Sequence, residues 1–81
     1  MEVAQSAPTA STVELRLAAI ALQRRLTGEI QTYEQRYELR SVDLEDALKS
    51  GRIHETAEVV DWVISYRTLL GLADELKAPA Q

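Results

Sequence analysis

The feature that most constrains this chain is a long proline-free segment with apolar residues at helical spacing. Proline occurs only at positions 8 and 79, so every residue between them keeps the backbone N–H group that a helix requires. Apolar residues recur every three or four positions in this segment, and no alternating stretch is long enough to indicate a strand. The segment therefore predicts an all-α fold.

The first helix is predicted over residues 12–38. Ser11 and Glu14 have the spacing of a capping box, in which the hydroxyl and the carboxylate each accept a hydrogen bond from a backbone N–H group. An apolar stripe then continues for about six helical turns. Its members are expected to face the core: Leu15, Ala19, Leu22, Leu26, Ile30, Tyr33 and Tyr37.

The first half of this helix has a second apolar face, formed by Val13, Leu17 and Ile20, nearly opposite the stripe. A helix in a small monomer has only one core to cover it. We therefore expect these three residues to pack against a second chain in a homodimer. The alternative is that the N-terminal tail of the same chain covers this face.

Two further helices are predicted after a corner at residues 38–40. Ser41 is expected to cap a short helix that runs to Ser50, and Gly51 is expected to end it in the left-handed conformation. Thr56, or else Glu55, is expected to cap a third helix that runs to about residue 76. The apolar stripe of this helix consists of Val59, Trp62, Val63, Tyr66, Leu70 and Ala73.

These elements predict an all-α fold with a long helix, a short helix and a long helix. The two long helices are expected to form an antiparallel helical hairpin that dimerises into a helical bundle. Gly71 interrupts the last helix, where it costs about 1 kcal/mol relative to alanine, so we expect a close helix contact there. Residues 11–77 would form a single domain between flexible tails at 1–10 and 78–81.

The predicted structural core consists of Leu22, Leu26, Ile30, Tyr33, Tyr37, Trp62, Tyr66 and Leu70. In an antiparallel hairpin, Tyr33 and Tyr37 at the end of the first long helix would meet Trp62. The alternative for Trp62 and Tyr66 is an exposed interface hot spot, because Trp and Tyr dominate interface energetics.

Acidic residues are concentrated in the second half of the chain. Residues 41–81 contain eight acids and four bases, whereas residues 14–40 contain four acids and five bases. An acidic surface repels phosphate backbones and attracts basic proteins. We therefore expect no direct nucleic-acid binding. The predicted partner-binding residues are Asp43, Glu45, Asp46, Glu55, Glu58 and Asp61.

Residue types that carry enzyme chemistry are scarce. The 81 residues include no Cys and one His, which excludes disulfides, thiolate catalysis and thiolate metal sites. His54 and Glu58 could supply half of a metal site, but an exposed turn residue is the simpler interpretation of His54. No phosphate-binding loop or nucleophile motif is present. We predict no catalytic residue, no metal and no cofactor.

The start of the sequence has no basic region followed by an apolar stretch, so no signal peptide is expected. The apolar runs are also too short to span a membrane. These features predict a cytoplasmic protein that does not bind membranes.

One set of residues spans the predicted corner, the short helix and the start of the third helix: Tyr33, Glu34, Gln35, Arg36, Tyr37, Leu39, Ser41, Leu44, Leu48, Gly51, Ile53, Trp62 and Tyr66. The set resembles small all-helical antitoxin-like proteins of prokaryotic toxin–antitoxin pairs. In those proteins a long helix ends in an aromatic-rich turn, and a Trp and a Tyr open the helix after a glycine turn. The resemblance implies a non-catalytic protein whose partner is a small toxin, usually an enzyme that acts on nucleic acid.

The sequence therefore predicts a protein-binding module that neutralises a small, basic partner toxin through an acidic helical surface. Charge attraction would speed association, and the bound chain would block the partner's nucleic-acid site. The alternative is a self-associating structural or assembly protein with a helical-bundle fold, whose acids only keep it in solution.

Overall fold

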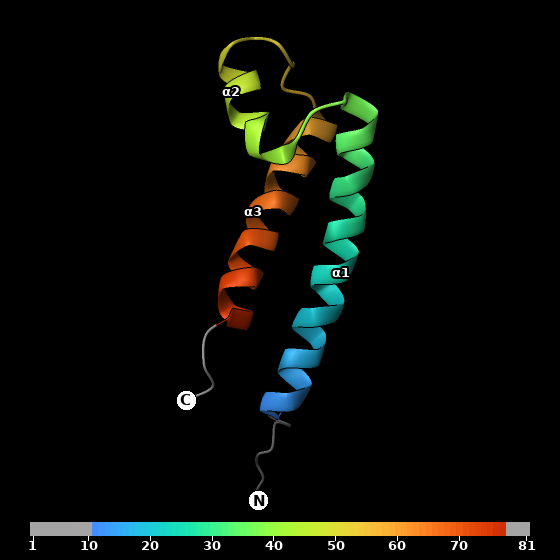
Figure 1. Cartoon of the computed structure of the whole chain (residues 1–81), viewed down its shortest axis with the longest axis vertical. Helices are drawn as coiled ribbons and strands as arrows, with labels where there is room; N and C mark the ends of the chain where they lie inside the picture. The colour runs from blue at the N-terminus through green and yellow to red at the C-terminus, as the bar shows by residue number, and fades with distance from the viewer. Residues whose placement is uncertain (1–10, 78–81) are drawn as a thin grey trace, which may run out of the picture.

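The computed structural model describes residues 11–77, and within them it is all-helical. The long helix α1 (Thr12–Tyr37) leads into the single-turn 3₁₀ helix η1 (Ser41–Asp43), the short helix α2 (Leu44–Lys49) and the long helix α3 (Ala57–Lys77) (Figure 1). The order of long, short and long helices is as predicted. The predicted tails at 1–10 and 78–81 lie outside the described residues.

The predicted capping box begins α1. The backbone N–H of Glu14 donates to Ser11 Oγ over 3.1 Å, and the backbone N–H of Ser11 donates to Glu14 Oε1 over 2.9 Å. The helix ends at Glu38, which adopts the left-handed conformation with φ of 51°. The predicted start of this helix is confirmed, and its end agrees to one residue.

The predicted role of Ser41 as a helix cap is wrong. Neither η1 nor α2 has a side-chain cap, and α2 begins only at Leu44. Ser41 is instead buried, with its backbone N–H donating to Glu34 Oε2 and its hydroxyl accepting a hydrogen bond from Trp62. The hydroxyl accepts the hydrogen bond of the buried indole N–H and does not cap a helix.

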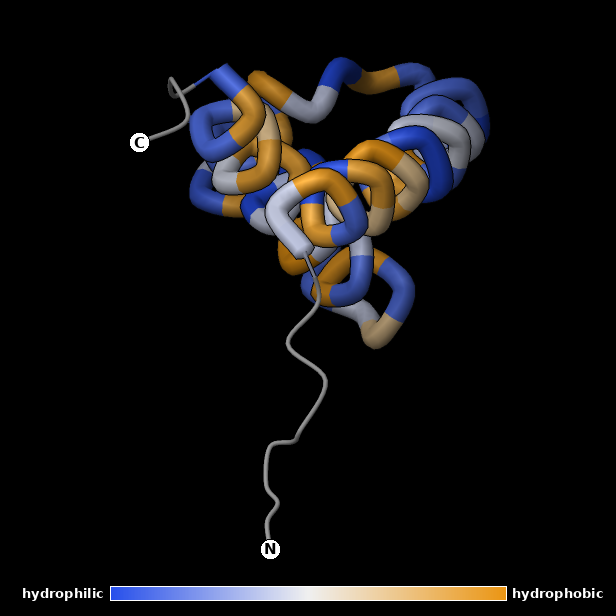
Figure 2. The backbone as a smooth tube through the Cα atoms, turned by 90° about the horizontal axis from the view of Figure 1, so that it is seen from below, coloured by the Kyte–Doolittle hydropathy of each residue, from blue (hydrophilic) through white to orange (hydrophobic). Residues whose placement is uncertain are grey.

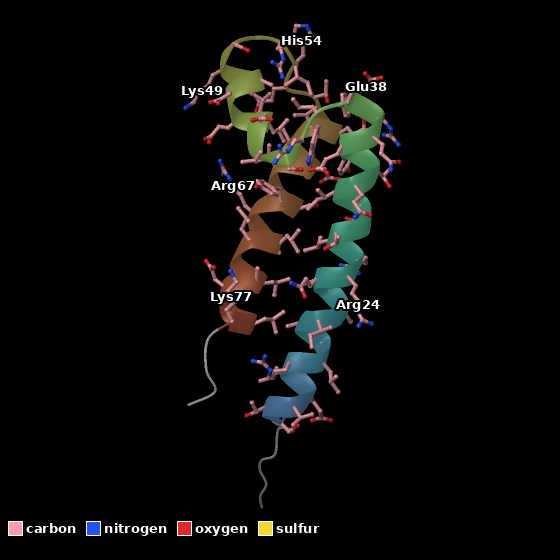
Figure 3. The ribbon with its side chains drawn as sticks, viewed as in Figure 1. Arg24, Glu38, Lys49, His54, Arg67 and Lys77 are labelled. Atoms are coloured by element: carbon pink, nitrogen blue, oxygen red, sulfur yellow. The ribbon has the colours of Figure 1, made fainter. Side chains whose placement is uncertain are left out.

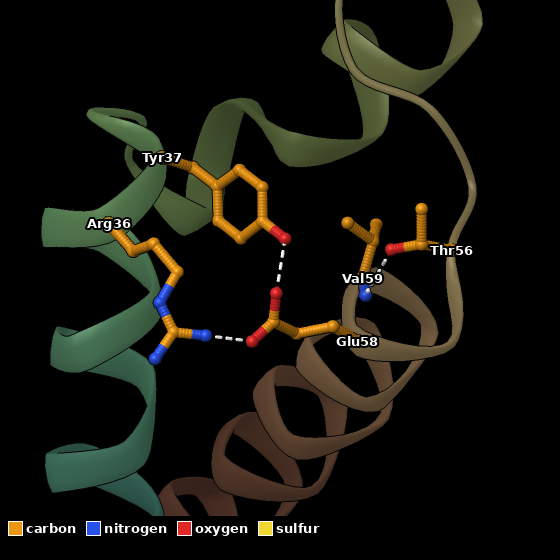
Figure 4. Close-up of polar contacts among 5 residues, drawn as sticks. All are labelled: Arg36, Tyr37, Thr56, Glu58 and Val59. Atoms are coloured by element: carbon orange, nitrogen blue, oxygen red, sulfur yellow. Dashed lines mark hydrogen bonds and ion pairs between the residues drawn. The ribbon is translucent and has the colours of Figure 1, made fainter.

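The turn before α3 forms as predicted. Gly51 has φ of 79°, in the left-handed region that favours glycine. Thr56 caps α3, because its hydroxyl accepts a hydrogen bond from the backbone N–H of Val59 over 3.2 Å (Figure 4). Gly71 lies in the middle of α3 with no atom within 4 Å of where a Cβ would be. Within residues 11–77, no helix therefore makes the close contact predicted at Gly71.

The two long helices lie side by side, and α2 packs at one end of the pair (Figure 1). Near the start of α1, an Arg16 guanidinium nitrogen donates to the backbone carbonyl of Leu76 over 3.1 Å. Near the end of α1, Arg36 pairs with Glu58 close to the start of α3. We call the end that holds α2 the closed end and the end that holds Arg16 and Leu76 the open end.

The core lies at the closed end. Its buried cluster consists of Ile30, Leu44, Val59 and Trp62, with Tyr33, Tyr37, Leu39, Leu48, Ile53, Val63, Tyr66 and Leu69 packed around it. Leu26 and Ala47 are also buried. Of the predicted core residues, Leu26, Ile30 and Trp62 are buried, and Leu22, Tyr33, Tyr37 and Tyr66 are half-buried.

Leu70 was predicted in the core, and that prediction is wrong because 49% of its surface is exposed. Leu15, from the predicted stripe of α1, is 59% exposed. Leu70 lies at the edge of the part of α3 that η1 and α2 cover, because it lines a hollow together with Val42 and Leu48. Leu15 lies near the start of α1, where no third element of the described chain covers the long helices. Figure 2, seen from the open end, shows apolar residues on both long helices at this end.

Candidate functional site

A groove of about 260 Å³ lies between η1–α2 and α3. Val42 and Leu70 are its most exposed apolar residues, at 60% and 49%. The groove is lined by Ser41, Val42, Leu44, Glu45, Leu48, Val63, Tyr66, Arg67 and Leu70. Apolar side chains make up most of this lining, so the groove offers a contact for another apolar surface.

Two opposite charges flank the groove. A guanidinium nitrogen of Arg67 lies 4.0 Å from Glu45 Oε2, and the two side chains are 72% and 70% exposed. Arg67 projects from α3 on the side where α2 lies (Figure 3). An ion pair this exposed contributes little to stability, so both groups remain available to a partner.

Three of the six predicted partner-binding acids lie together on η1 and α2. Asp43, Glu45 and Asp46 are all exposed. Asp43 and Asp46 line a second hollow together with Arg52, while Glu45 borders the groove. We call these three residues the acidic segment.

The other predicted acids are placed elsewhere. Glu55 is exposed in the turn before α3, and Asp61 is exposed on α3. Asp61 lies about 180° around the helix axis from Leu70, at 100° per residue, and so faces away from the groove. The structure therefore does not bring the six acids together on one face.

Glu58 is engaged within the chain. One of its carboxylate oxygens pairs with Arg36 and the other accepts a hydrogen bond from the hydroxyl of Tyr37 (Figure 4). These contacts join the end of α1 to the start of α3. Because both oxygens have partners, Glu58 is less available to another protein than the acidic segment.

The face predicted for dimerisation is largely uncovered in the single chain. Val13 is 66% exposed and Leu17 is 61% exposed, whereas Ile20 is half-buried. Helical periodicity identified these three residues because they form a second apolar set on α1, separate from the main stripe.

The predicted meeting of Tyr33 and Tyr37 with Trp62 is confirmed. Both tyrosine rings stack on the indole, with ring centroids 5.6 Å and 5.5 Å away. Trp62 is 0% exposed, so the alternative of an exposed hot spot is wrong for this residue. Tyr66 lies at the edge of the core and also lines the groove.

Sequence reasoning missed Val42 as a surface residue of the groove. Val42 belongs to no helical stripe, because η1 is a single 3₁₀ turn whose periodicity differs from that of an α-helix. The only feature of the sequence that could have indicated an exposed Val42 is its position next to three acidic residues. Its 60% exposure depends on how α2 packs against α3.

His54 is exposed in the turn before α3 (Figure 3). Within residues 11–77, no three His, Cys, Asp or Glu side chains are grouped so that they could hold a metal ion. No helix in that part of the chain combines the length and apolar content needed to cross a membrane.

The groove and the acidic segment thus present apolar and acidic groups side by side at the surface of η1 and α2. Comparison of the chain with models of known protein families, with curated proteins and with solved structures found no match.

Proposed function

We propose that this chain is a non-catalytic, antitoxin-like protein-binding module that neutralises a small, basic partner protein. The observation that carries the proposal is the acidic segment, Asp43, Glu45 and Asp46, exposed beside an apolar groove. Exposed charges that complement those of a partner increase the association rate and fix the orientation of the complex.

The mechanism would be steric and electrostatic. The acidic segment would occupy the basic surface on which the partner binds nucleic acid or a nucleotide. Glu55 and Asp61 would extend the negative field around this contact. This mechanism needs no cofactor, no metal and no direct contact between this chain and nucleic acid, and the proposal places it in the cytoplasm.

Self-association is the second part of the proposal. The chain would form an antiparallel helical hairpin that dimerises into a helical bundle, with Val13, Leu17 and Ile20 at the contact. The exposure of Val13 and Leu17 supports this part, because exposed apolar residues clustered on one helix favour association.

The same exposed residues favour one alternative, a self-associating structural or assembly protein with a helical-bundle fold. In that alternative the acidic segment only maintains solubility. The two candidates differ in whether a second protein is required.

The neighbouring reading frame supplies the test. The protein encoded beside this chain is expressed alone and together with this chain, and cell growth is followed. We expect slower growth with the neighbour alone and restored growth with both. Purified together, the two proteins should elute as one complex, and the neighbour's nuclease or nucleotide-binding activity should fall.

Two results would count against neutralisation. A neighbour that has no effect on growth and does not bind the chain would support the assembly protein instead. Restored growth without a complex would point to an indirect effect, so binding of the two purified proteins is measured in the same series.

A further inference from the structure

The side of the α1–α3 pair on which α2 packs is covered only at the closed end. There η1 and α2 form a second layer, and Leu44 and Ala47 are each 2% exposed. Among residues 11–77, no other element continues this layer, and Figure 1 shows α1 and α3 extending past α2 as a pair. We call this uncovered side of α1 and α3, together with the groove, the second-layer face.

On α1, Glu34 marks the side that faces η1 and α2, because its carboxylate accepts a hydrogen bond from the backbone N–H of Ser41 over 2.8 Å. At 100° per residue, Ile20 lies about 40° and Val13 about 60° from Glu34 around the helix axis. Leu17 lies about 100° from Glu34, at the margin of this side. Ile20 and Val13 therefore belong to the second-layer face.

On α3, the groove marks the same side. Val63, Tyr66 and Leu70 line the groove together, and Leu70 is the most exposed of the three at 49%. Ile64 is also exposed, at 57%, but it lies about 120° from Leu70 around the helix axis and outside the face. Apolar residues of both long helices thus share the second-layer face.

Charges of both signs border this face. Glu45 and Arg67 flank the groove, and both are largely exposed. Farther along α3, Asp74 and Lys77 are exposed and lie within about 40° of Leu70 around the helix axis. A two-fold related copy can present a base to each acid of such a border, whereas a basic protein would be repelled by Arg67 and Lys77.

We propose that a second copy of this chain packs on the second-layer face, so that each hairpin completes the second layer of the other. Ile20 and Leu70 would lie near the centre of this contact, and Val13 and Val42 farther out. The inference rests on the self-association part of the proposed function and deepens it. It assigns the contact to α1, α3 and the groove, in place of a face of α1 alone that is centred on Leu17.

The test is the mass of the full chain in solution, compared for two variants of α3. Leu70→Glu places a charge at the centre of the proposed contact, and Ile64→Glu places the same charge on a residue of similar exposure outside it. Light scattering at micromolar concentration should give twice 9.1 kDa for the native chain and for Ile64→Glu. Leu70→Glu should give 9.1 kDa with an unchanged helical circular dichroism spectrum.

Other results would overturn the inference. A native chain that is monomeric at this concentration would do so, and so would a Leu70→Glu variant that remains dimeric. In the latter case, dissociation by Leu17→Glu would assign the dimer to a face of α1 alone that is centred on Leu17. If removing residues 2–10 converts a monomer into a dimer, the chain's own N-terminal segment occupies the face.

The neighbouring protein provides the last comparison. The native chain could be monomeric alone, and the Leu70→Glu variant could fail to bind the neighbouring protein. These two results together would assign the second-layer face to that partner, against our inference. Dimer mass is measured on the isolated chain, whereas neutralisation is measured with the partner present. The two proposals therefore fail independently.

Discussion

The indole N–H of Trp62 donates to the hydroxyl of Ser41 over 2.8 Å, and the two residues are 0% and 4% exposed. Ser41 also donates its backbone N–H to Glu34 Oε2 over 2.8 Å. This pair of hydrogen bonds connects α3 to α1 through the corner that precedes α2. It satisfies the one polar atom of the indole at the centre of an otherwise apolar cluster.

Ser41→Ala should therefore destabilise the protein by about 1–3 kcal/mol, because a buried N–H donor would be left without an acceptor. Ser65→Ala provides the matched control on α3, and it should leave the free energy of unfolding almost unchanged. Urea unfolding followed by tryptophan fluorescence measures both variants. Equal stability of Ser41→Ala and the native chain would mean that the hydrogen bond contributes nothing.

Trp62→Ala should cost about 3–5 kcal/mol, the usual loss when a large buried aromatic side chain is removed. Tyr33 and Tyr37 both stack on the indole, so neither ring can fill the space without losing contacts of its own. Because so small a domain has only about 4–12 kcal/mol of total stability, the variant should be largely unfolded at moderate urea. In the native chain, tryptophan emission should be blue-shifted and move to the red on unfolding.

Two glycine substitutions should act in opposite directions. Gly71→Ala should stabilise the chain by about 1 kcal/mol, because alanine favours a helix interior and the new methyl group meets nothing within 4 Å. Gly51→Ala should destabilise it by about 1–2 kcal/mol, because φ of 79° is unfavourable for an L side chain. Thermal unfolding by circular dichroism measures both, and shifts of the same sign would contradict this account.

Removing the contact between Arg36 and Glu58 should have a small effect. The two side chains are 53% and 38% exposed, and ion pairs at such positions contribute about 0–1 kcal/mol. Arg36→Gln should lower the free energy of unfolding by no more than this, and the difference should shrink at high salt. A loss that exceeds this range and persists in high salt would indicate a packing role for Arg36.

Neutralising the acidic segment should slow association with the basic partner and leave the fold intact. The double variant Asp43→Asn, Asp46→Asn removes two charges of the acidic segment. The control is the double variant Glu29→Gln, Glu75→Gln, which removes two charges at exposed positions elsewhere. Stopped-flow association at several salt concentrations should show a flatter salt dependence only for the first pair. Identical rates for both variants would mean that the acidic segment acts only in solvation.

The sequence by itself determined the helices and most of their ends. The capping box at Ser11, the left-handed glycine at Gly51 and the hydroxyl cap at Thr56 act through bonds within a few residues. Local interactions of this kind are encoded in short segments, so a pattern of residue types is enough to locate them. Helical period, together with the expectation of an antiparallel hairpin, also predicted that Tyr33 and Tyr37 meet Trp62.

Only the tertiary structure decided which apolar residues are covered. Leu70 fits the same stripe as Trp62, yet Leu70 is 49% exposed and Trp62 is 0% exposed. Periodicity gives the direction of a side chain around its helix but not the length over which another element covers that side. Because α2 is only six residues long, it covers the closed end and leaves Leu70 and Val42 exposed. The burial of Ser41 likewise depends on tertiary contacts, since its partners Glu34 and Trp62 belong to the two long helices.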